Sequence, residues 1–136
     1  MILFINTASP ENIFLALLDK EGKTLVKKKI SAKYKQSEKL LVEIEKLRNK
    51  EIKGGTKSLR GIIAVKGPGS FTALRIGLTT ANTMAFGLNI PVVGVMDGIL
   101  EKIIKEGVSE LKKVKVGNYV MPEYGAEPNI TLKQDK

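Results

Sequence analysis

Few residues of this chain can do chemistry, because its 136 residues include no His and no Cys. Their absence excludes a Ser-His-Asp triad, a histidine base, a thiolate nucleophile and the usual zinc and iron–sulfur sites. It also excludes a disulfide framework. Carboxylate, lysine, hydroxyl or backbone chemistry remains possible, as does no catalysis, and we expect no metal and no cofactor.

One glycine-rich turn could hold an anion. The segment Gly67-Pro-Gly-Ser-Phe-Thr72 lies between an apolar run and a predicted helix, where backbone N–H groups can bind phosphate. It is neither a P-loop nor a complete G-x-G-x-x-G motif. The alternative is a rigid strand-to-helix corner, in which Ser70 caps the helix. A nucleotide at this corner would contact Asn6, Thr7, Gly67, Gly69 and Ser70.

The carboxylates are poorly placed for a two-metal site. Such a site needs an acidic residue after the first strand, where this chain has the neutral Asn6. Asp97 follows the fifth predicted strand, but it is equally well explained as the polar start of a helix. We therefore expect no two-metal centre.

The elements that must position these residues follow from the apolar periodicity. It predicts strands over residues 1–5, 12–18, 23–30, 61–65 and 91–95, and helices over 37–50, 71–87 and 96–106. Ser37 is the expected N-cap of the first helix. The turn Asp19–Gly22 predicts a hairpin, so that the first three strands form an antiparallel meander. Residues 53–56 and 112–115 are expected loops, and residues 119–132 an extended tail.

The order β-β-β-α-β-α-β-α is typical of the actin-like ATPase (ASKHA) and RNase H-like half-domains. These are α/β folds in which right-handed crossovers place helices on a mixed sheet. We expect residues 1–110 to form one actin-like domain of the N-terminal type. Residues 111–136 are then a basic linker and an extended C-terminal tail.

Positive charge is concentrated in one region of the chain. The net charge is 23 − 14 = +9, and 13 basic and 5 acidic residues fall between Lys20 and Lys57. A nucleic-acid surface is one interpretation. The other is a solvated Lys-rich surface, which is favoured because Arg is scarce and Tyr34 is the only aromatic residue in that region. With no signal peptide and no bilayer-length apolar run, we expect a cytoplasmic protein without a membrane partner.

The second predicted helix is nearly free of charge, since Arg75 is the only charged residue between Gly67 and Met96. One apolar stripe, from Leu74 to Leu88, should pack on the sheet. A surface helix normally has Lys and Glu on its other side, so we expect a protein partner there. The alternative is that the third helix or the tail covers it. The residues opposite the apolar stripe are Arg75, Thr79, Asn82, Thr83 and Phe86.

The stretch Gly67-Pro-Gly-Ser-Phe-Thr-Ala-Leu-Arg-Ile-Gly77 resembles the G-P-G-S-F-T-G-L-R-I-G signature of the TsaB (YeaZ) family at ten of its eleven positions. Ala73 replaces a glycine of the signature. Asn6-Thr7-Ala8 is similar to the family's D-T-S, and Gln36-Ser37-Glu38 with Leu40-Leu41 to its H-S-E-x-L-L. The segment Ala85–Gly94 also resembles the family's A-x-G-L-x-I-P-x-x-G-V.

The resemblance implies an actin-like fold without catalytic activity of its own. It implies a partner subunit of a TsaD-type enzyme, which completes threonylcarbamoyladenosine next to the anticodon of tRNA. It also implies self-association as a homodimer, a TsaE-type ATPase in a larger complex, and only indirect contact with tRNA. The family is sometimes labelled peptidase M22 or glycoprotease, but the lack of His and Cys argues against proteolysis.

The family's contacts involve its first two helices. The residues expected to bind the partner are therefore Leu41, Ile44, Arg75, Thr79, Asn82, Thr83 and Phe86.

Two departures from the family leave other functions open. Family chains have a second α/β half between the third helix and the tail, which we expect to be missing or reduced here. Asn6 also replaces the family's Asp, so nucleotide binding is less expected. The alternatives are a standalone ATP-binding or phosphotransfer protein with half an actin-like fold, and a tRNA-binding module that uses the Lys20–Lys57 surplus.

Overall fold

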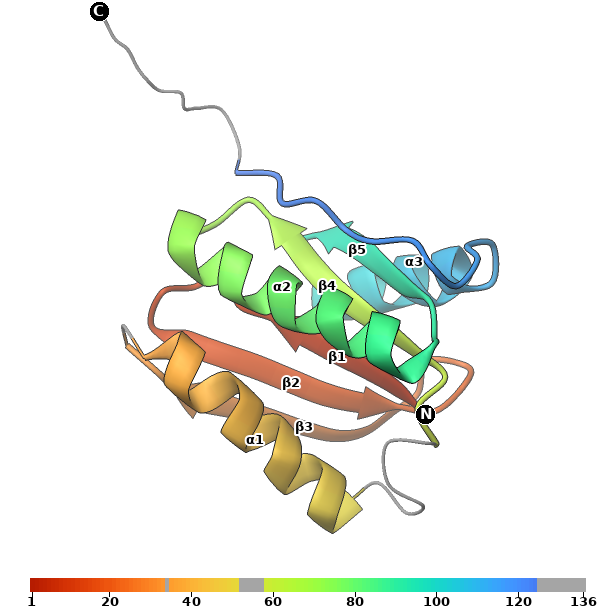
Figure 1. Cartoon of the computed structure of the whole chain (residues 1–136), viewed down its shortest axis with the longest axis horizontal. Helices are drawn as coiled ribbons and strands as arrows, with labels where there is room; N and C mark the ends of the chain where they lie inside the picture. The colour runs from red at the N-terminus through yellow and green to blue at the C-terminus, as the bar shows by residue number, and fades with distance from the viewer. Residues whose placement is uncertain (34, 52–57, 125–136) are drawn as a thin grey trace, which may run out of the picture.

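The computed structural model describes residues 1–33, 35–51 and 58–124 (Figure 1). The expected loop at 53–56 and the tail beyond residue 124 lie outside the described residues. The described elements are β1 (Ile2–Asn6), β2 (Asn12–Leu18), β3 (Thr24–Ser31), α1 (Gln36–Glu51), β4 (Gly61–Gly67), α2 (Phe71–Leu88), β5 (Val92–Met96) and α3 (Leu100–Leu111).

The strands form one mixed sheet in the order β3-β2-β1-β4-β5. β1, β2 and β3 pair antiparallel, whereas β4 and β5 run parallel to β1. The meander starts from the predicted turn, in which the Asp19 carboxylate accepts backbone N–H bonds from Glu21 and Lys23, each at 2.9 Å. The expected α/β architecture is confirmed.

Helices cover both faces of the sheet (Figure 1). α1 and α2 pack on one face, where Leu3 and Ile5 of β1 point. α3 packs on the other face, where Ile2 and Phe4 point. β1 is therefore buried on both sides, which explains its unbroken apolar sequence. No helix among the described residues is both long enough and apolar enough to cross a bilayer.

Two predicted helix starts are wrong. α1 begins at Gln36, whose side-chain amide donates to the carbonyls of Ser9 and Pro10, so Ser37 is not the N-cap. α3 begins at Leu100 rather than Met96. β5 ends at Met96, one residue later than predicted, because the Asp97 N–H donates to the Gly67 carbonyl at 2.7 Å and extends the pairing of β4 with β5.

α2 lies against the sheet through the predicted apolar stripe. Leu74, Leu78, Ala81 and Ala85 are buried, and the Ser70 hydroxyl caps the helix by accepting the Ala73 N–H at 3.5 Å. The helix approaches the β1–β2 turn so closely that a Cβ on Gly77 would lie 2.1 Å from the Thr7 hydroxyl oxygen. Gly77 therefore sets the distance between α2 and this turn.

We expect Gly77→Ala to lower the free energy of unfolding by about 2 kcal/mol, because the added methyl overlaps a buried side chain. Gly87→Ala is the matched control in the same helix, since a Cβ there would meet nothing within 4 Å. The higher helix propensity of Ala should leave that variant as stable as the parent or up to about 1 kcal/mol more stable. Urea unfolding measures both, and equal stability of the two variants would contradict the packing role of Gly77.

One ion pair joins α1 to the edge strand. Lys28 of β3 lies 2.7 Å from the carboxylate of Glu43, which is nearly buried, and Lys46 lies 3.4 Å from the other carboxylate oxygen. The ion pair with Lys28, and secondarily that with Lys46, holds the pKa of Glu43 below its usual value despite the opposing effect of burial. Ionised Glu43 therefore stabilises the fold.

This stabilisation should be present above the ordinary Glu pKa of about 4.3 and disappear as the pH falls through the lower pKa of the folded state. Glu43→Gln should cost about 1 kcal/mol at pH 7 and reduce the loss of stability on acidification below pH ~4. Glu45→Gln is the control, because the Glu45–Arg48 pair is on the surface and such pairs contribute little. Unfolding measured between pH 2.5 and 7 tests this, and identical pH profiles for the parent and Glu43→Gln would refute it.

Candidate functional site

The glycine corner and the β1–β2 turn meet at the carboxyl edge of the parallel strands. The Ser70 N–H donates to the Ala8 carbonyl at 2.9 Å. A Cβ on Gly69 would lie 2.5 Å from that same oxygen. The two backbones are thus in direct contact, and Gly69 has no room for a side chain. Phosphate has no room between Gly69 and Ala8 either.

The other residues of the corner also serve the fold. The Thr7 hydroxyl is buried and donates to the Ala73 carbonyl at 2.7 Å. Gly67 has φ +144°, and a Cβ there would overlap the Glu123 carbonyl. The structure brings together the residues expected to bind phosphate, but it uses Thr7, Gly67, Gly69 and Ser70 for packing, turning and capping. These contacts favour the interpretation of the segment as a rigid corner.

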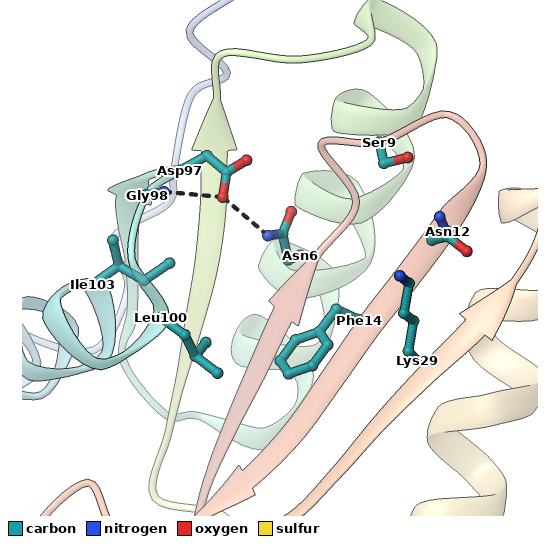
Figure 2. A pocket seen from close by; sticks show the side chains of 9 residues that line it. All are labelled: Asn6, Ser9, Asn12, Phe14, Lys29, Asp97, Gly98, Leu100 and Ile103. Carbon is teal, nitrogen blue, oxygen red and sulfur yellow. Dashed lines mark hydrogen bonds between the residues drawn. The ribbon is translucent and has the colours of Figure 1, made fainter.

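Asn6 faces a hollow of about 440 Å³ between β2 and α3 (Figure 2). Its side-chain amide donates to the Asp97 carboxylate at 3.2 Å, and the same carboxylate oxygen accepts the Gly98 N–H at 3.0 Å. Asp97 therefore closes the loop between β5 and α3 instead of starting the helix. No group of three or more Asp or Glu side chains that could hold a metal ion occurs in the part of the chain that the structure describes.

Four of the expected docking residues lie exposed on α2. They share the side of the helix that points away from the sheet and comprise Arg75, Thr79, Thr83 and Phe86. Phe86 is 86% exposed, which is unusual for a large apolar side chain. The Arg75 guanidinium lies 5.4 Å from the centre of the Phe71 ring, so its charge is held at one end of this row of exposed residues.

α1 borders this row of exposed residues on one side. A shallow groove of about 340 Å³ between the two helices is lined by Leu41 and Ser37 of α1 and by Ile76 and Thr79 of α2. Leu41 is 56% exposed, as its expected role requires. Ile44 is only 5% exposed and packs in the core beneath α1, so it is not available to a partner. The term α1–α2 face is used below for the surface formed by Leu41, Arg75, Thr79, Thr83 and Phe86.

Residues 118–124, termed the C-terminal strap below, border the row of exposed residues on its other side. Asn82 holds this strap through two hydrogen bonds, donating to the Val120 carbonyl at 3.0 Å and accepting the Val120 N–H at 2.8 Å. Asn82 therefore binds the chain's own backbone. Residues 118–124, the described part of the tail, lie along one flank of α2, as one of the alternatives predicted, and do not cover the four exposed residues.

The strap has further anchors that the sequence analysis missed. Asn118 pairs through its side chain with the backbone of Val92, and Tyr124 stacks on Phe71 with ring centres 4.4 Å apart. A Cβ on Gly94 would lie 2.5 Å from the Val120 side chain. In the sequence, Gly94 could have predicted this contact, because a glycine inside a strand often marks the close approach of another segment.

A family model described as TsaD, tRNA N6-adenosine threonylcarbamoyltransferase, matches residues 29–110. A tRNA N6-adenosine threonylcarbamoyltransferase from Geotalea daltonii is 53% identical over 38 residues, which are 28% of this chain and 11% of that protein. A tRNA threonylcarbamoyladenosine biosynthesis protein TsaB from Bacillus subtilis is 49% identical over 39 residues, 29% of this chain and 17% of that protein.

Two solved structures have the same fold. A YeaZ from Pseudomonas aeruginosa has a TM-score of 0.61 and 28% identity, covering 71% of this chain and 44% of that one. A second chain, described as similar to peptidase YeaZ from Pseudomonas aeruginosa, has a TM-score of 0.62 and 28% identity, covering 71% of this chain and 43% of that one. The chain thus spans less than half the length of these relatives. Because the family model covers more than half of the chain, and the structural neighbours are YeaZ proteins, the chain belongs to the TsaD family and is a TsaB (YeaZ) member of it.

Proposed function

We propose that this chain is a non-catalytic subunit that binds a TsaD-type enzyme and supports the formation of threonylcarbamoyladenosine next to the anticodon of tRNA. The names of its relatives from Geotalea daltonii and Bacillus subtilis support the pathway. The composition supports a non-catalytic role, because the chain has no His and no Cys to act as base, nucleophile or soft metal ligand.

The observation that carries the proposal is the α1–α2 face. Helix α2 exposes Thr79, Thr83 and Phe86 without a single Lys, Asp or Glu on that side, in a chain with 27% charged residues. The cores of protein interfaces are depleted in charged residues and enriched in aromatic ones. A solvated face would have no such pattern.

The shape of this face suits a helical partner. The groove between α1 and α2 provides an apolar wall at Leu41 and Ile76, and hydroxyl groups at Ser37 and Thr79. A helix of the partner lying along this groove would pack against both α1 and α2 and complete a helix bundle. Self-association would use the same face, so a homodimer and the TsaD-type complex should compete. A TsaE-type ATPase would then join the complex with the enzyme.

The alternative, a standalone ATP-binding or phosphotransfer protein, has less support. Its phosphate contacts would have come from the glycine corner, where Gly69 packs directly against Ala8 and the Thr7 hydroxyl is already bonded. We therefore do not propose nucleotide binding at this corner.

We expect Thr79→Lys to weaken the complex with the TsaD-type enzyme by about 10- to 100-fold, because an unpaired ammonium would be desolvated in the interface. Leu41→Asp should act in the same way from the other wall of the groove. Ser109→Lys, on the exposed surface of α3, is the matched control that adds the same charge elsewhere. Isothermal titration calorimetry with the purified enzyme measures the affinities.

Both docking variants should unfold at the same urea concentration as the parent, because both side chains are exposed. Unchanged affinity in Thr79→Lys and in Leu41→Asp would show that the face is wrong. Failure of the parent protein to bind the enzyme at micromolar concentrations would overturn the proposed function.

Asn82 is expected to matter for the strap and not for docking. Asn82→Ala should lower the free energy of unfolding by about 1–3 kcal/mol, because the N–H and carbonyl of Val120 lose their partners. It should also make residues 118–124 more sensitive to limited proteolysis. Thr83→Ala, one residue along the same helix, removes an exposed hydroxyl and is the control. A cleavage rate in Asn82→Ala equal to that of the control would contradict the role of Asn82.

A further inference from the structure

The two faces of the sheet are covered unequally. α1 and α2 lie side by side on one face, whereas α3 is the only described helix on the other (Figure 1). The main contacts of α3 with the sheet are those with β4 and β5. Five strands about 4.8 Å apart span roughly 19 Å, whereas one helix is about 10 Å wide. The part of this face that belongs to β3 is therefore left without a helix.

A hollow of about 530 Å³ lies in this uncovered part, between the first half of α3 and the beginning of β3. Its apolar lining consists of Ile99, Leu100 and Ile104. The turn between β2 and β3 lies close to α3 beside it, because a Cβ on Gly22 would be 3.6 Å from the Ile104 side chain. The hollow is thus a gap between a strand and a helix that the subunit itself does not fill.

Ile99, at the rim of this hollow, is unfavourable in an isolated subunit for two reasons. Its side chain is 64% exposed, although it is large and apolar. It is also the N-cap of α3 and makes no side-chain hydrogen bond there, where Ser, Thr, Asp or Asn would stabilise the helix. Burial of Ile99 against another chain would offset both costs.

The charges that line the hollow are balanced. Glu21 and Lys27 lie on its β2–β3 side, and Glu101 and Lys105 lie on its α3 side. All four side chains are exposed, and within the part of the chain that the structure describes none of them forms an ion pair. Their net charge is 2 − 2 = 0, in a chain whose net charge is +9. Two copies of so basic a chain repel each other least where their surfaces are locally neutral.

We infer that two copies of this chain associate through the α3 surface, which is the surface formed by Ile99, Glu101, Lys105 and this hollow. In an isologous pair both copies present the same surface. Glu101 and Lys105 are one helical turn apart, so two antiparallel α3 helices place Glu101 of each copy beside Lys105 of the other. A polyanion or a polycation would be repelled by half of these charges, whereas a copy turned by 180° matches both signs. Each α3 helix would then lie beside β3 of the other copy, where that sheet has no helix.

The α3 surface and the α1–α2 face lie on opposite faces of the sheet. Association through α3 therefore does not compete with the TsaD-type enzyme, unlike self-association through the α1–α2 face. It rests on the proposed function only for the assignment of the α1–α2 face to that enzyme. The complex with the enzyme should then contain two copies of each protein.

The test uses the Leu41→Asp variant as its background, because this substitution removes self-association through the α1–α2 face. Sedimentation velocity should show it as a dimer with a Kd below about 0.1 mM. Adding Ile99→Ser should weaken the dimer about tenfold or more, because a large side chain is lost from the contact. The same change should raise the urea concentration at which the protein unfolds, since Ser caps a helix better than Ile. Unfolding then cannot be the cause of a weaker dimer.

An exchange of charge tests the antiparallel pairing in the same background. Glu101→Lys presents two lysines to its copy and Lys105→Glu presents two glutamates, so each variant alone should dimerise about tenfold or more weakly. An equimolar mixture of the two should dimerise as the Leu41→Asp protein does, because opposite charges then meet in both pairs. Lys102→Glu and Glu106→Lys are the matched controls, at exposed positions of α3 that do not line the hollow. Each should dimerise within about twofold of the background protein, since exposed charges away from the contact are largely screened.

Three outcomes would overturn the inference. The first is a Leu41→Asp protein that is still monomeric at about 0.3 mM. The second is a dimer that Ile99→Ser leaves unchanged, or that the two control variants weaken as much as Glu101→Lys and Lys105→Glu do. The third is a mixture of the two charge variants that remains monomeric, because the charges of α3 then do not pair between copies.

One further measurement separates this inference from the proposed function. With Leu41 intact, Glu101→Lys should bind the TsaD-type enzyme with the affinity of the parent, but in a complex that contains one copy of each protein instead of two. Leu41→Asp should still dimerise while its affinity for the enzyme falls. A parent protein that dimerises through α3 but does not bind the enzyme would contradict only the proposed function. A parent complex with one copy of each protein would contradict only the α3 pairing.

Discussion

Direct contact between the Asn6–Ala8 turn and the start of α2 determines the layout of this molecule. Gly69 meets the Ala8 backbone, and Gly77 meets the Thr7 side chain, at distances that admit no Cβ. The buried bond from the Thr7 hydroxyl to the Ala73 carbonyl ties the same two segments together. Because α2 is held at this distance, its apolar stripe reaches the sheet, and the side on which Arg75 is the only charged residue points outward.

The two flanks of α2 then decide what remains accessible. α1 covers one flank and leaves a shallow groove at Leu41. The C-terminal strap covers the other flank through Asn82 and the stacking of Tyr124 on Phe71. What is left between them is a narrow band centred on Thr79 and Thr83. A band of this kind, with a rigid helix on one side, the hydrogen-bonded strap on the other and the exposed Phe86 at one end, is pre-organised for a partner and loses little conformational freedom on binding.

The edge strand shows how one sheet can separate two roles. The alternation of side chains along β3 sends Lys28 to α1, where Glu43 uses it to hold the helix, and sends Lys27 and Lys29 to the opposite face. The first contributes to stability, and the other two are exposed at the edge of the sheet. A one-residue change of register would exchange these roles, so the pairing of β3 with β2 matters for both.

Much of this protein follows from local sequence. The continuous apolar run of β1, the Asp19–Gly22 turn and the stripe on α2 predicted a buried first strand, the antiparallel meander and the side of α2 that packs on the sheet, because periodicity and turn chemistry act over short range. The exposed positions of Arg75, Thr79, Thr83 and Phe86 agree with the same pattern, whereas the exposed position of Leu41 agrees with what the family resemblance implied. The tertiary structure alone decided the roles of Asn82, which the pattern had grouped with the exposed residues, and of Ile44, which the family resemblance had placed at the partner surface. Asn82 is engaged by Val120, which is 38 residues away in the chain. Such a contact depends on where the tail returns to the domain, and helix periodicity holds no information about that.

The tertiary structure also decided the role of the glycine corner. The sequence allowed either phosphate binding or packing there, and only the position of Ala8 against Gly69 distinguishes them.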